Sequence, residues 1–251
     1  MLDTPLQSIL VTVAGPIFGS FAATVAHRVA AGTSPWSGRS RCPACGHALA
    51  FDDLVPIASW IALGGRCRYC RAAIGHFEFA VEALALAIAI MAVARFGGGE
   101  AWLAAGLGWA LLALAATDAR AMVLPDPITL PLALAGFAAT AWLAPERLAS
   151  HAAAAGGVFA LFLAIRLVYR RLRGREGLGL GDAKLMAGAG AWLGPEPLPI
   201  VVLAAALAAL AVTGLRQWRQ GRIDPVAPVP FGAYLAPAIW LVWLADPAGL
   251  F

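Results

Sequence analysis

Charged side chains are scarce in this chain of 251 residues: they make up 13% of it, against about 25% in an ordinary soluble domain. Lysine is almost absent, since 17 of the 18 cationic residues are arginine. So few charges fit neither a disordered chain nor a basic nucleic-acid-binding domain, and we expect no nucleic-acid partner. Hydrophobic residues instead reach 61% and the mean hydropathy is +0.78, more apolar side chain than one soluble core of this size can bury. The composition indicates a polytopic membrane protein.

Apolar stretches divide the chain into about eight segments that are long enough, or nearly so, to cross a bilayer. The sixth is short and contains Lys184, which suggests a half-helix or a tilted span. Its run of alanine and glycine over 187–191 has the small side chains that allow close helix packing in membranes. The first is too long, and lacks the basic start, for a cleavable signal peptide. The eight segments are Leu6–Ala31, Phe77–Phe96, Ala101–Ala116, Ile128–Ala144, Ala152–Tyr169, Ala183–Leu193, Leu198–Leu215 and Val229–Ala245.

The arrangement of the cations predicts how these segments cross the membrane. If the polar stretch 32–76 is cytoplasmic, alternation puts loops 117–127, 170–182 and 216–228 on the same side. Sixteen of the 18 cations then lie at cytoplasmic ends, and only Arg95 and Arg147 lie outside. This asymmetry follows the positive-inside rule and puts both termini outside the cytoplasm. We therefore expect an all-α membrane protein with three parts: a first helix over 1–31, a cytoplasmic module over 32–76 and a membrane core over 77–251.

All four cysteines lie in the polar module. Cys42 and Cys45 form one Cys-x-x-Cys pair, and Cys67 and Cys70 form a second pair 21 residues later. This spacing is typical of a structural zinc site with four thiolate ligands. Disulfides and free thiols are the alternatives, and a reducing cytoplasm argues against disulfides. Four thiolates leave no open position for water, so a catalytic zinc is not expected.

Two aspartates stand out because ionisable groups at membrane depth are costly and commonly functional. Asp118 ends the third apolar segment, and Asp182 opens the sixth; the predicted topology puts both at the cytoplasmic edge. Two carboxylates in a poorly hydrated site share a proton, so that one acts as base and the other as acid in peptide hydrolysis. The alternatives are a helix N-cap for Asp182 and a loop charge pairing with Arg120 for Asp118.

Several motifs resemble those of bacterial prepilin peptidases, the type IV leader peptidases. Gly179, Gly181 and Asp182, followed by Lys184, look like their Gly-x-Gly-Asp motif, and Asp118 with Leu-Pro-Asp (124–126) looks like their first aspartate motif. The resemblance extends over nearly the whole chain. The other matching stretches are Gly-Ser-Phe (19–21), His-Arg (27–28), the two cysteine pairs, Asp-Leu-Val-Pro (53–56), Ser-Trp (59–60) and Pro-Phe-Gly (230–232).

The resemblance implies an aspartyl protease of the bacterial inner membrane, with Asp118 and Asp182 as the catalytic pair. Such enzymes cut the basic leader from prepilins or pseudopilins of type IV pili and type II secretion, at the cytoplasmic face. Gly179, Gly181 and Lys184 would support the active site, and membrane lipid would surround the helices. Without the resemblance, a membrane scaffold or small-ion transporter with a zinc module is the competing interpretation.

Many members of that family also methylate the new N-terminal amine with S-adenosylmethionine. Here the chain departs from the family pattern: Ala-Ala-Thr (22–24) follows Gly-Ser-Phe where members commonly carry Asn, and Phe-Glu-Phe (77–79) replaces an Arg-Tyr-Pro. The sequence contains no glycine-rich dinucleotide-type fingerprint. Glu82, at the membrane edge, is a candidate amine-binding group or a partner for a nearby arginine. A leader peptidase without methyltransferase activity is therefore the second hypothesis.

Overall fold

A computed structural model describes residues 4–36, 38–221, 224 and 227–245 of the chain. The chain divides into two compact units, residues 1–121 and 122–251, and each is described by itself. The described residues form helices joined by turns, with two isolated β-bridges and no strand. The predicted all-α class is confirmed.

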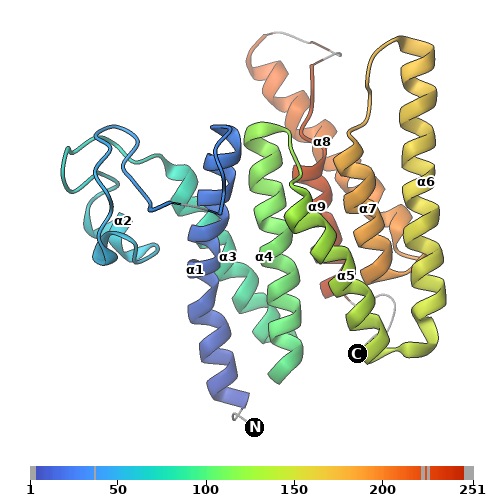
Figure 1. The fold of residues 1–251 in the computed structure, drawn as a ribbon, viewed down its shortest axis with the longest axis horizontal. Helices are drawn as coiled ribbons and strands as arrows, with labels where there is room; N and C mark the ends of the chain where they lie inside the picture. Colours follow the sequence, from blue (N-terminus) through green and yellow to red (C-terminus); the bar gives the residue numbers. More distant parts are fainter. Residues whose placement is uncertain (1–3, 37, 222–223, 225–226, 246–251) are drawn as a thin grey trace. The chain divides into compact units, whose positions relative to one another are not determined.

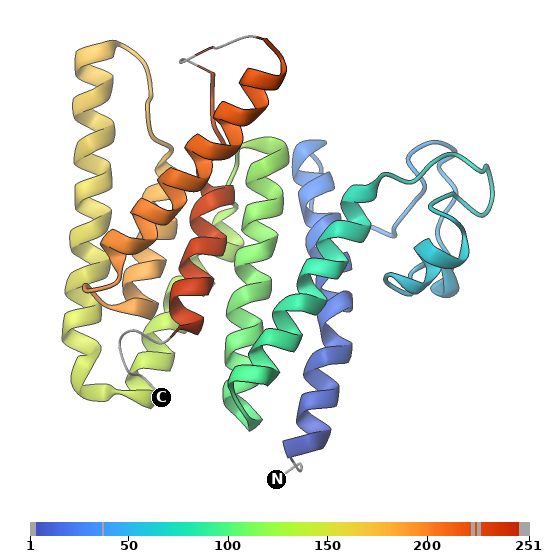
Figure 2. The same ribbon diagram turned by 180° about the vertical axis from the view of Figure 1, so that it is seen from behind.

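Three long helices form the body of the first unit: α1 (Thr4–Ala30), α3 (His76–Arg95) and α4 (Gly98–Ala121). Each packs against the other two (Figures 1 and 2). Two glycines on α1 let it approach α3 closely: a Cβ on Gly15 would lie 2.8 Å from the Ala85 carbonyl oxygen, and one on Gly19 would lie 2.6 Å from Glu82 Cα. Small residues one turn apart are a common device for close helix packing in membranes. The Gly-Ser-Phe motif thus begins with a packing residue.

The polar module follows α1 and leads into α3 (Figure 1). It contains a short 3-10 turn, η1 (Phe51–Asp53), and a short helix, α2 (Ala58–Ala62). Its two β-bridges, Arg41 with Ala48 and Arg66 with Ala73, each close a loop around one cysteine pair.

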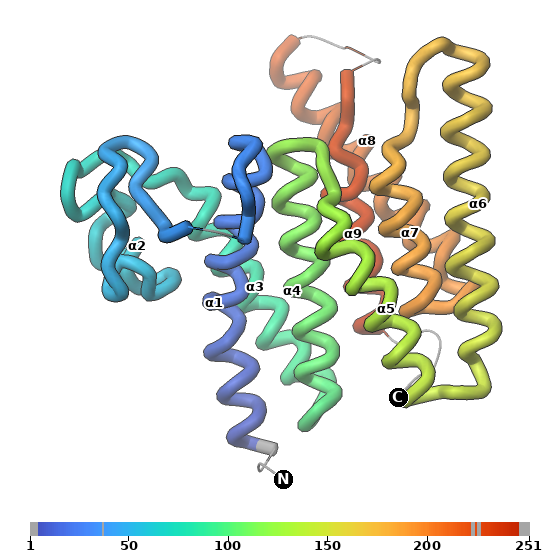
Figure 3. Tube along the Cα trace, viewed as in Figure 1, coloured from blue at the N-terminus to red at the C-terminus, as the bar shows by residue number. Residues whose placement is uncertain are grey.

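The second unit is built around α7 (Leu180–Leu193), which packs against α5 (Asp126–Leu143), α6 (Leu148–Arg173) and α9 (Gly232–Leu244) (Figure 3). A 3-10 turn, η2 (Pro145–Arg147), joins α5 to α6, and α8 (Leu198–Arg219) packs mainly on α9. The predicted close packing of 187–191 is confirmed: a Cβ on Gly190 would lie 2.6 Å from the Ala155 backbone nitrogen.

Each of the eight predicted apolar segments contains a helix. Among the described residues, six helices are long and apolar enough to cross a membrane, namely α1, α3, α4, α5, α6 with its preceding turn, and α8. With 14 and 13 residues, α7 and α9 rise only about 20 Å, less than the roughly 30 Å of a hydrocarbon core. Most of α7 is buried by its neighbours and needs no lipid contact along its length. The count of eight spans stays a prediction, and Arg222 and the terminal residues used for the topology lie outside the described residues.

Candidate functional site

The four cysteine sulfurs converge on one point, as the spacing predicts. Their Sγ atoms all lie within 4.8 Å of one another, and Cys42 Sγ is 3.8 Å from Cys70 Sγ. The thiols form no disulfide, whose sulfurs would be about 2.05 Å apart. Around a tetrahedral ion with Zn–S bonds of about 2.3 Å, sulfurs sit about 3.8 Å apart. The cluster therefore has the dimensions of a four-thiolate metal site.

The two cysteine pairs lie in two separate backbone turns that have the same conformation. Cys42 donates its N–H to the His47 carbonyl (2.9 Å), and Cys67 donates its N–H to the Ala72 carbonyl (2.9 Å). The residue after each pair has a positive φ, +71° at Gly46 and +59° at Arg71. Glycine adopts this conformation freely, whereas arginine is strained there. The module thus contains one metal-binding turn twice, with unequal backbone strain.

Two of the thiols, Cys42 and Cys70, have pKa values shifted from that of a free cysteine. The pKa of Cys42 is lowered to about 7, chiefly because it accepts a hydrogen bond from the backbone N–H of Cys45. The N–H of Ala72 lowers the pKa of Cys70, but burial and the hydrogen bonds with the other three thiols outweigh it and raise that pKa to about 11. One thiol is therefore ready to ionise near neutrality, and a bound divalent cation would stabilise the remaining thiolates.

Asp53 clamps the second cysteine pair to the middle of the module. Its carboxylate accepts hydrogen bonds from Arg68 Nε (2.6 Å), the Tyr69 hydroxyl (2.9 Å) and the Ala50 N–H (3.1 Å). Burial raises the pKa of Asp53, but these donors outweigh it and hold the pKa below its ordinary value. From the sequence, Asp53 stood out only as part of the Asp-Leu-Val-Pro motif; the available signal for its role was the Arg and Tyr enclosed by the second cysteine pair.

Asp118 lies in the last turn of α4 and is 5% exposed. Beside it, Arg120 joins the ends of all three helices of the unit. Its guanidinium lies 3.2 Å from His27 Nε2 and 4.1 Å from the centre of the Phe77 ring, while His27 pairs with Glu78. Arg120, expected from the sequence as an alternative partner for Asp118, thus has partners on α1 and α3.

Glu82 is buried on α3, 7% exposed, directly beneath the polar module. Its carboxylate accepts a hydrogen bond from the Ile57 backbone N–H (2.7 Å). Ile57 has a positive φ of +63°, a strained conformation for a β-branched residue. The observed partner of Glu82 is therefore a backbone amide of the module, and neither of the roles weighed from the sequence involves this contact.

Asp182 lies in the first turn of α7 and is 8% exposed. Gly179 is the N-cap residue of α7, and Asp182, three residues later, accepts a hydrogen bond on Oδ2 from the Gly179 N–H (3.2 Å), so the alternative that made Asp182 the N-cap is wrong by three positions. Gly181 packs against Leu124, where a Cβ would lie 3.0 Å from Leu124 Cβ. The Gly-x-Gly-Asp motif thus holds its aspartate at a buried helix start.

Lys184 pairs with Asp126 rather than with Asp182. Its Nζ lies 2.7 and 2.8 Å from the two carboxylate oxygens of Asp126. The second unit therefore brings Leu-Pro-Asp (124–126) and Gly-Leu-Gly-Asp-Ala-Lys (179–184) together through two contacts, Leu124 with Gly181 and Asp126 with Lys184. Asp118 belongs to the first unit and Asp182 to the second.

Comparisons of the sequence with family models and with known proteins find clear similarities. A model of the type IV leader peptidase family matches residues 107–214, and a model described as the bacterial peptidase A24 N-terminal domain matches residues 13–96. A protein of Burkholderia pseudomallei (strain K96243) with the name "Prepilin leader peptidase/N-methyltransferase" is 48% identical over 201 residues. Proteins with the same name from Aeromonas salmonicida (strain A449) and Pseudomonas aeruginosa are 38% and 36% identical over 214 and 211 residues.

The matched region covers 79% of this chain and 64% of the Burkholderia protein, and 82% of this chain and 71% of the other two relatives. The chain thus spans less than two thirds of the length of the Burkholderia relative. No solved structure gives a significant match.

Proposed function

Because the chain belongs to the type IV leader peptidase family, we propose that it is a membrane aspartyl endopeptidase that cleaves the leader peptide of prepilins or pseudopilins. The observation that carries the proposal is the buried Asp182 at the start of α7, within a Gly-x-Gly-Asp sequence fixed against Leu-Pro-Asp (124–126). The relatives' names support the substrate class.

Asp118 and Asp182 are the proposed catalytic pair. Each is a nearly buried carboxylate at a helix end, where water is excluded on one side and polar substrate can approach from the other. When two such groups work on one peptide bond, they hold a single proton between them. The ionised one takes a proton from water, whose oxygen attacks the carbonyl carbon, and the protonated one gives its proton to the leaving amine.

The supporting residues of the second unit have separate roles in this proposal. The Gly179 N–H holds one oxygen of Asp182, and Gly181 permits the close contact with Leu124. Lys184 fixes Asp126, and so the start of α5, to the first turn of α7. These contacts orient Asp182 at the start of α7.

We further propose that the four-cysteine cluster holds a structural zinc ion. The sulfur separations and the repeated turn suit a tetrahedral ion, and four thiolates would fill its coordination. In a module whose described residues form only short helices and two bridges, such an ion would supply much of the folding free energy.

The relatives' shared name supports a second activity, N-methylation of the new N-terminal residue with S-adenosylmethionine. That molecule supplies an electrophilic methyl group on a sulfonium. When bound, it would give this methyl group to the free amine and leave as the neutral thioether, and the amine nitrogen would lose one proton. The protein needs to hold the amine unprotonated and in line with the bond between the methyl carbon and sulfur.

For orientation, we propose the inner membrane with the catalytic aspartates facing the cytoplasm. The support is the positive-inside asymmetry, with 16 of 18 cations on one side of the predicted topology. In the first unit the His27–Glu78–Arg120 contacts join the ends of α1, α3 and α4, and Arg28 donates to the Pro35 and Gly38 carbonyls at the start of the polar module.

The test is cleavage of a prepilin in membranes that contain Asp118→Asn or Asp182→Asn, followed by mass measurement of the product. Each variant should abolish cleavage while inserting at normal level, and Glu146→Gln, in the turn η2, is the matched carboxylate control. Normal cleavage by either variant would overturn the aspartyl mechanism and favour a scaffold or transporter. With the unaltered chain, a product heavier by one methyl group supports methylation, and an unmodified product identifies a peptidase alone.

A further inference from the structure

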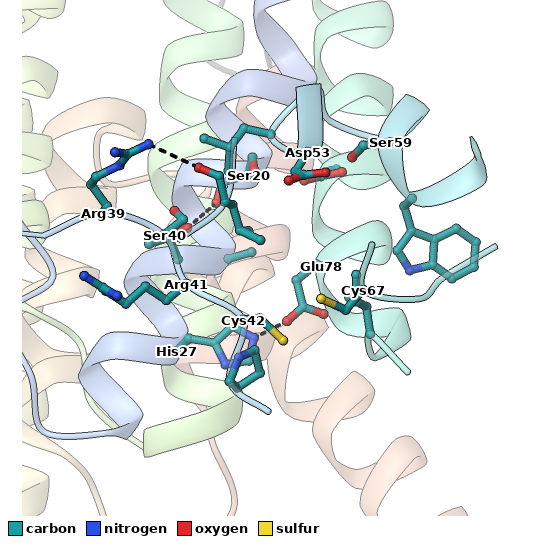
Figure 4. A pocket seen from close by; sticks show the side chains of 18 of the residues that line it. Ser20, His27, Arg39, Ser40, Arg41, Cys42, Asp53, Ser59, Cys67 and Glu78 are labelled. Atoms are coloured by element: carbon teal, nitrogen blue, oxygen red, sulfur yellow. Dashed lines mark hydrogen bonds and ion pairs between the residues drawn. The ribbon is translucent and has the colours of Figure 1, made fainter. Parts of the chain in front are cut away.

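The first unit contains a cavity of about 500 Å³ between the polar module and the adjoining ends of α1 and α3. Figure 4 shows its labelled lining: Ser20 and His27 come from α1, Glu78 from α3, and Arg39 through Cys67 from the module. Cavities of about 300–1,000 Å³ are typical of sites for small molecules and cofactors. The aspartyl protease chemistry proposed above does not use this space.

Two buried polar atoms on the cavity lining have no hydrogen-bond partner among the residues that the structure describes. The Trp60 Nε1–H is a buried donor without an acceptor, and Glu78 Oε2 is a buried acceptor without a donor. Leaving such an atom unpaired costs about 1–3 kcal/mol, so folded proteins rarely retain one without use. The other Glu78 oxygen is already paired with His27, which fixes the carboxylate in position (Figure 4).

The Trp60 side chain is held firmly. Its ring lies 4.6 Å from that of Phe79 and 5.6 Å from that of His76, between ring centres. Gly65, with a φ of +66°, lies against its other edge, where a Cβ would be 2.9 Å from Trp60 Cζ2. A rigid indole with an unused N–H is suited to contact a flat heteroaromatic group that offers acceptors.

The cavity also carries separated charges. Glu78 and Glu82 lie one turn apart on α3, and Arg39 and Arg41 line the cavity from the module. Each arginine gives one donor to a backbone carbonyl, of Leu49 and Gly46 respectively. A guanidinium has five N–H donors, so capacity for an anionic group remains.

We propose that this cavity binds S-adenosylmethionine, an inference that rests on the methylation part of the proposed function. The molecule combines a flat heteroaromatic base, sugar hydroxyls, a sulfonium cation and a carboxylate. Trp60 contacts the base, the Glu78 carboxylate faces the sulfonium, and the arginine side takes the amino-acid carboxylate. Carboxylates and aromatic faces are the groups that attract such onium cations.

A neighbouring cavity gives the methyl acceptor a place. Its volume is about 370 Å³, and it shares Ser20, Thr24 and Arg28 with the first. Phe21 and Trp36 line it, with ring centres 6.0 Å apart. An apolar N-terminal residue would pack against these rings, next to the proposed site of the methyl donor.

The test is the affinity of the zinc-loaded, detergent-purified full chain for S-adenosylmethionine and for S-adenosylhomocysteine, which lacks the methyl group and the charge. Trp60→Phe keeps the ring but removes the donor, so both compounds should bind about three- to tenfold more weakly. Glu78→Gln keeps the shape and a hydrogen bond to His27 but removes the charge. S-adenosylmethionine should then lose about tenfold to a hundredfold in affinity, and S-adenosylhomocysteine clearly less.

Trp142→Phe, an exposed indole on α5, and Glu176→Gln, a carboxylate paired with Arg166, are the matched controls and should leave both affinities unchanged. Zinc content is measured in every preparation to show that the module is folded. Unchanged affinities in both cavity variants would overturn the proposal, as would equal losses for the two compounds in Glu78→Gln.

Leader cleavage by the same preparations separates this inference from the proposed function. A chain that cleaves prepilin but binds neither compound overturns the cavity assignment and leaves the peptidase intact. The opposite outcome is also possible. Binding of both compounds with the expected dependence on Trp60 and Glu78, together with normal prepilin cleavage by the Asp182→Asn variant, would support the cavity assignment and overturn the aspartyl mechanism.

Discussion

Replacing Gly190 with alanine tests the contact that fixes α7, the helix of Asp182. The added Cβ would lie 2.6, 2.7 and 2.9 Å from backbone atoms of Ala154 and Ala155 on α6. Carbon atoms pack best at about 3.5–4.0 Å, so the two helices would have to separate by about 1 Å. Overpacking of this kind costs about 1–3 kcal/mol. Alanine also gains up to about 1 kcal/mol of helix propensity, which partly offsets the cost.

Gly156→Ala is the matched control, because Gly156 lies on α6 and a Cβ there would meet nothing within 4 Å. It has the same gain in propensity without the overlap. A difference of about 2 kcal/mol between the variants corresponds to about 4–8 °C in melting temperature for a protein of this size. Thermal unfolding in detergent measures it, with prepilin cleavage as a second readout. A Gly190→Ala protein as stable as Gly156→Ala would refute the close contact.

Two further predictions concern the polar module. Arg71→Gly removes the strained positive φ and should stabilise the metal-bound module by about 1 kcal/mol, measured as slower zinc release to a chelator. The equivalent change at Gly46, Gly46→Arg, should do the opposite, and equal release rates for both variants would contradict the shared turn geometry. Zinc affinity should fall as the pH is lowered, because zinc must displace protons held by thiols with pKa values up to about 11 at Cys70. Between about pH 8 and about pH 6 the zinc affinity should fall about tenfold or more for each pH unit. Competition with a chelator measures this affinity, and an affinity that does not change with pH would argue against thiolate ligands.

The helices were predictable because hydropathy marks the apolar length of each segment. The stretch Phe77–Phe96 agrees with α3 (His76–Arg95) within one residue at each end. The stretch Ala101–Ala116 was too short, since α4 continues through Asp118 to Ala121. A helix extends as far as its backbone hydrogen bonds are favourable, whereas hydropathy stops at the first polar side chains. The same difference lengthens α6 beyond Ala152–Tyr169.

The cysteine cluster was predictable because its information is local: two pairs at a fixed spacing specify a metal site. The pairing of Lys184 with Asp126 was not predictable, because the two residues are 58 positions apart and the residues around each give no indication of the other. The cavity around Trp60 depends on three segments that meet only in the folded unit. Long-range contacts of this kind follow from packing, which composition and periodicity do not specify.

The pairing of Lys184 has a practical consequence for experiments on this protein. The sequence contains no other lysine, so an amine-reactive reagent has only this side chain and the terminal amine to modify. Because the ammonium of Lys184 is partly covered and bound to Asp126, its acylation should be slow while α5 and α7 hold together, and fast once they part. The chain therefore contains a single lysine, two residues after Asp182, whose labelling reports on this contact. Labelling rates measured with and without a bound prepilin would show whether substrate opens this contact.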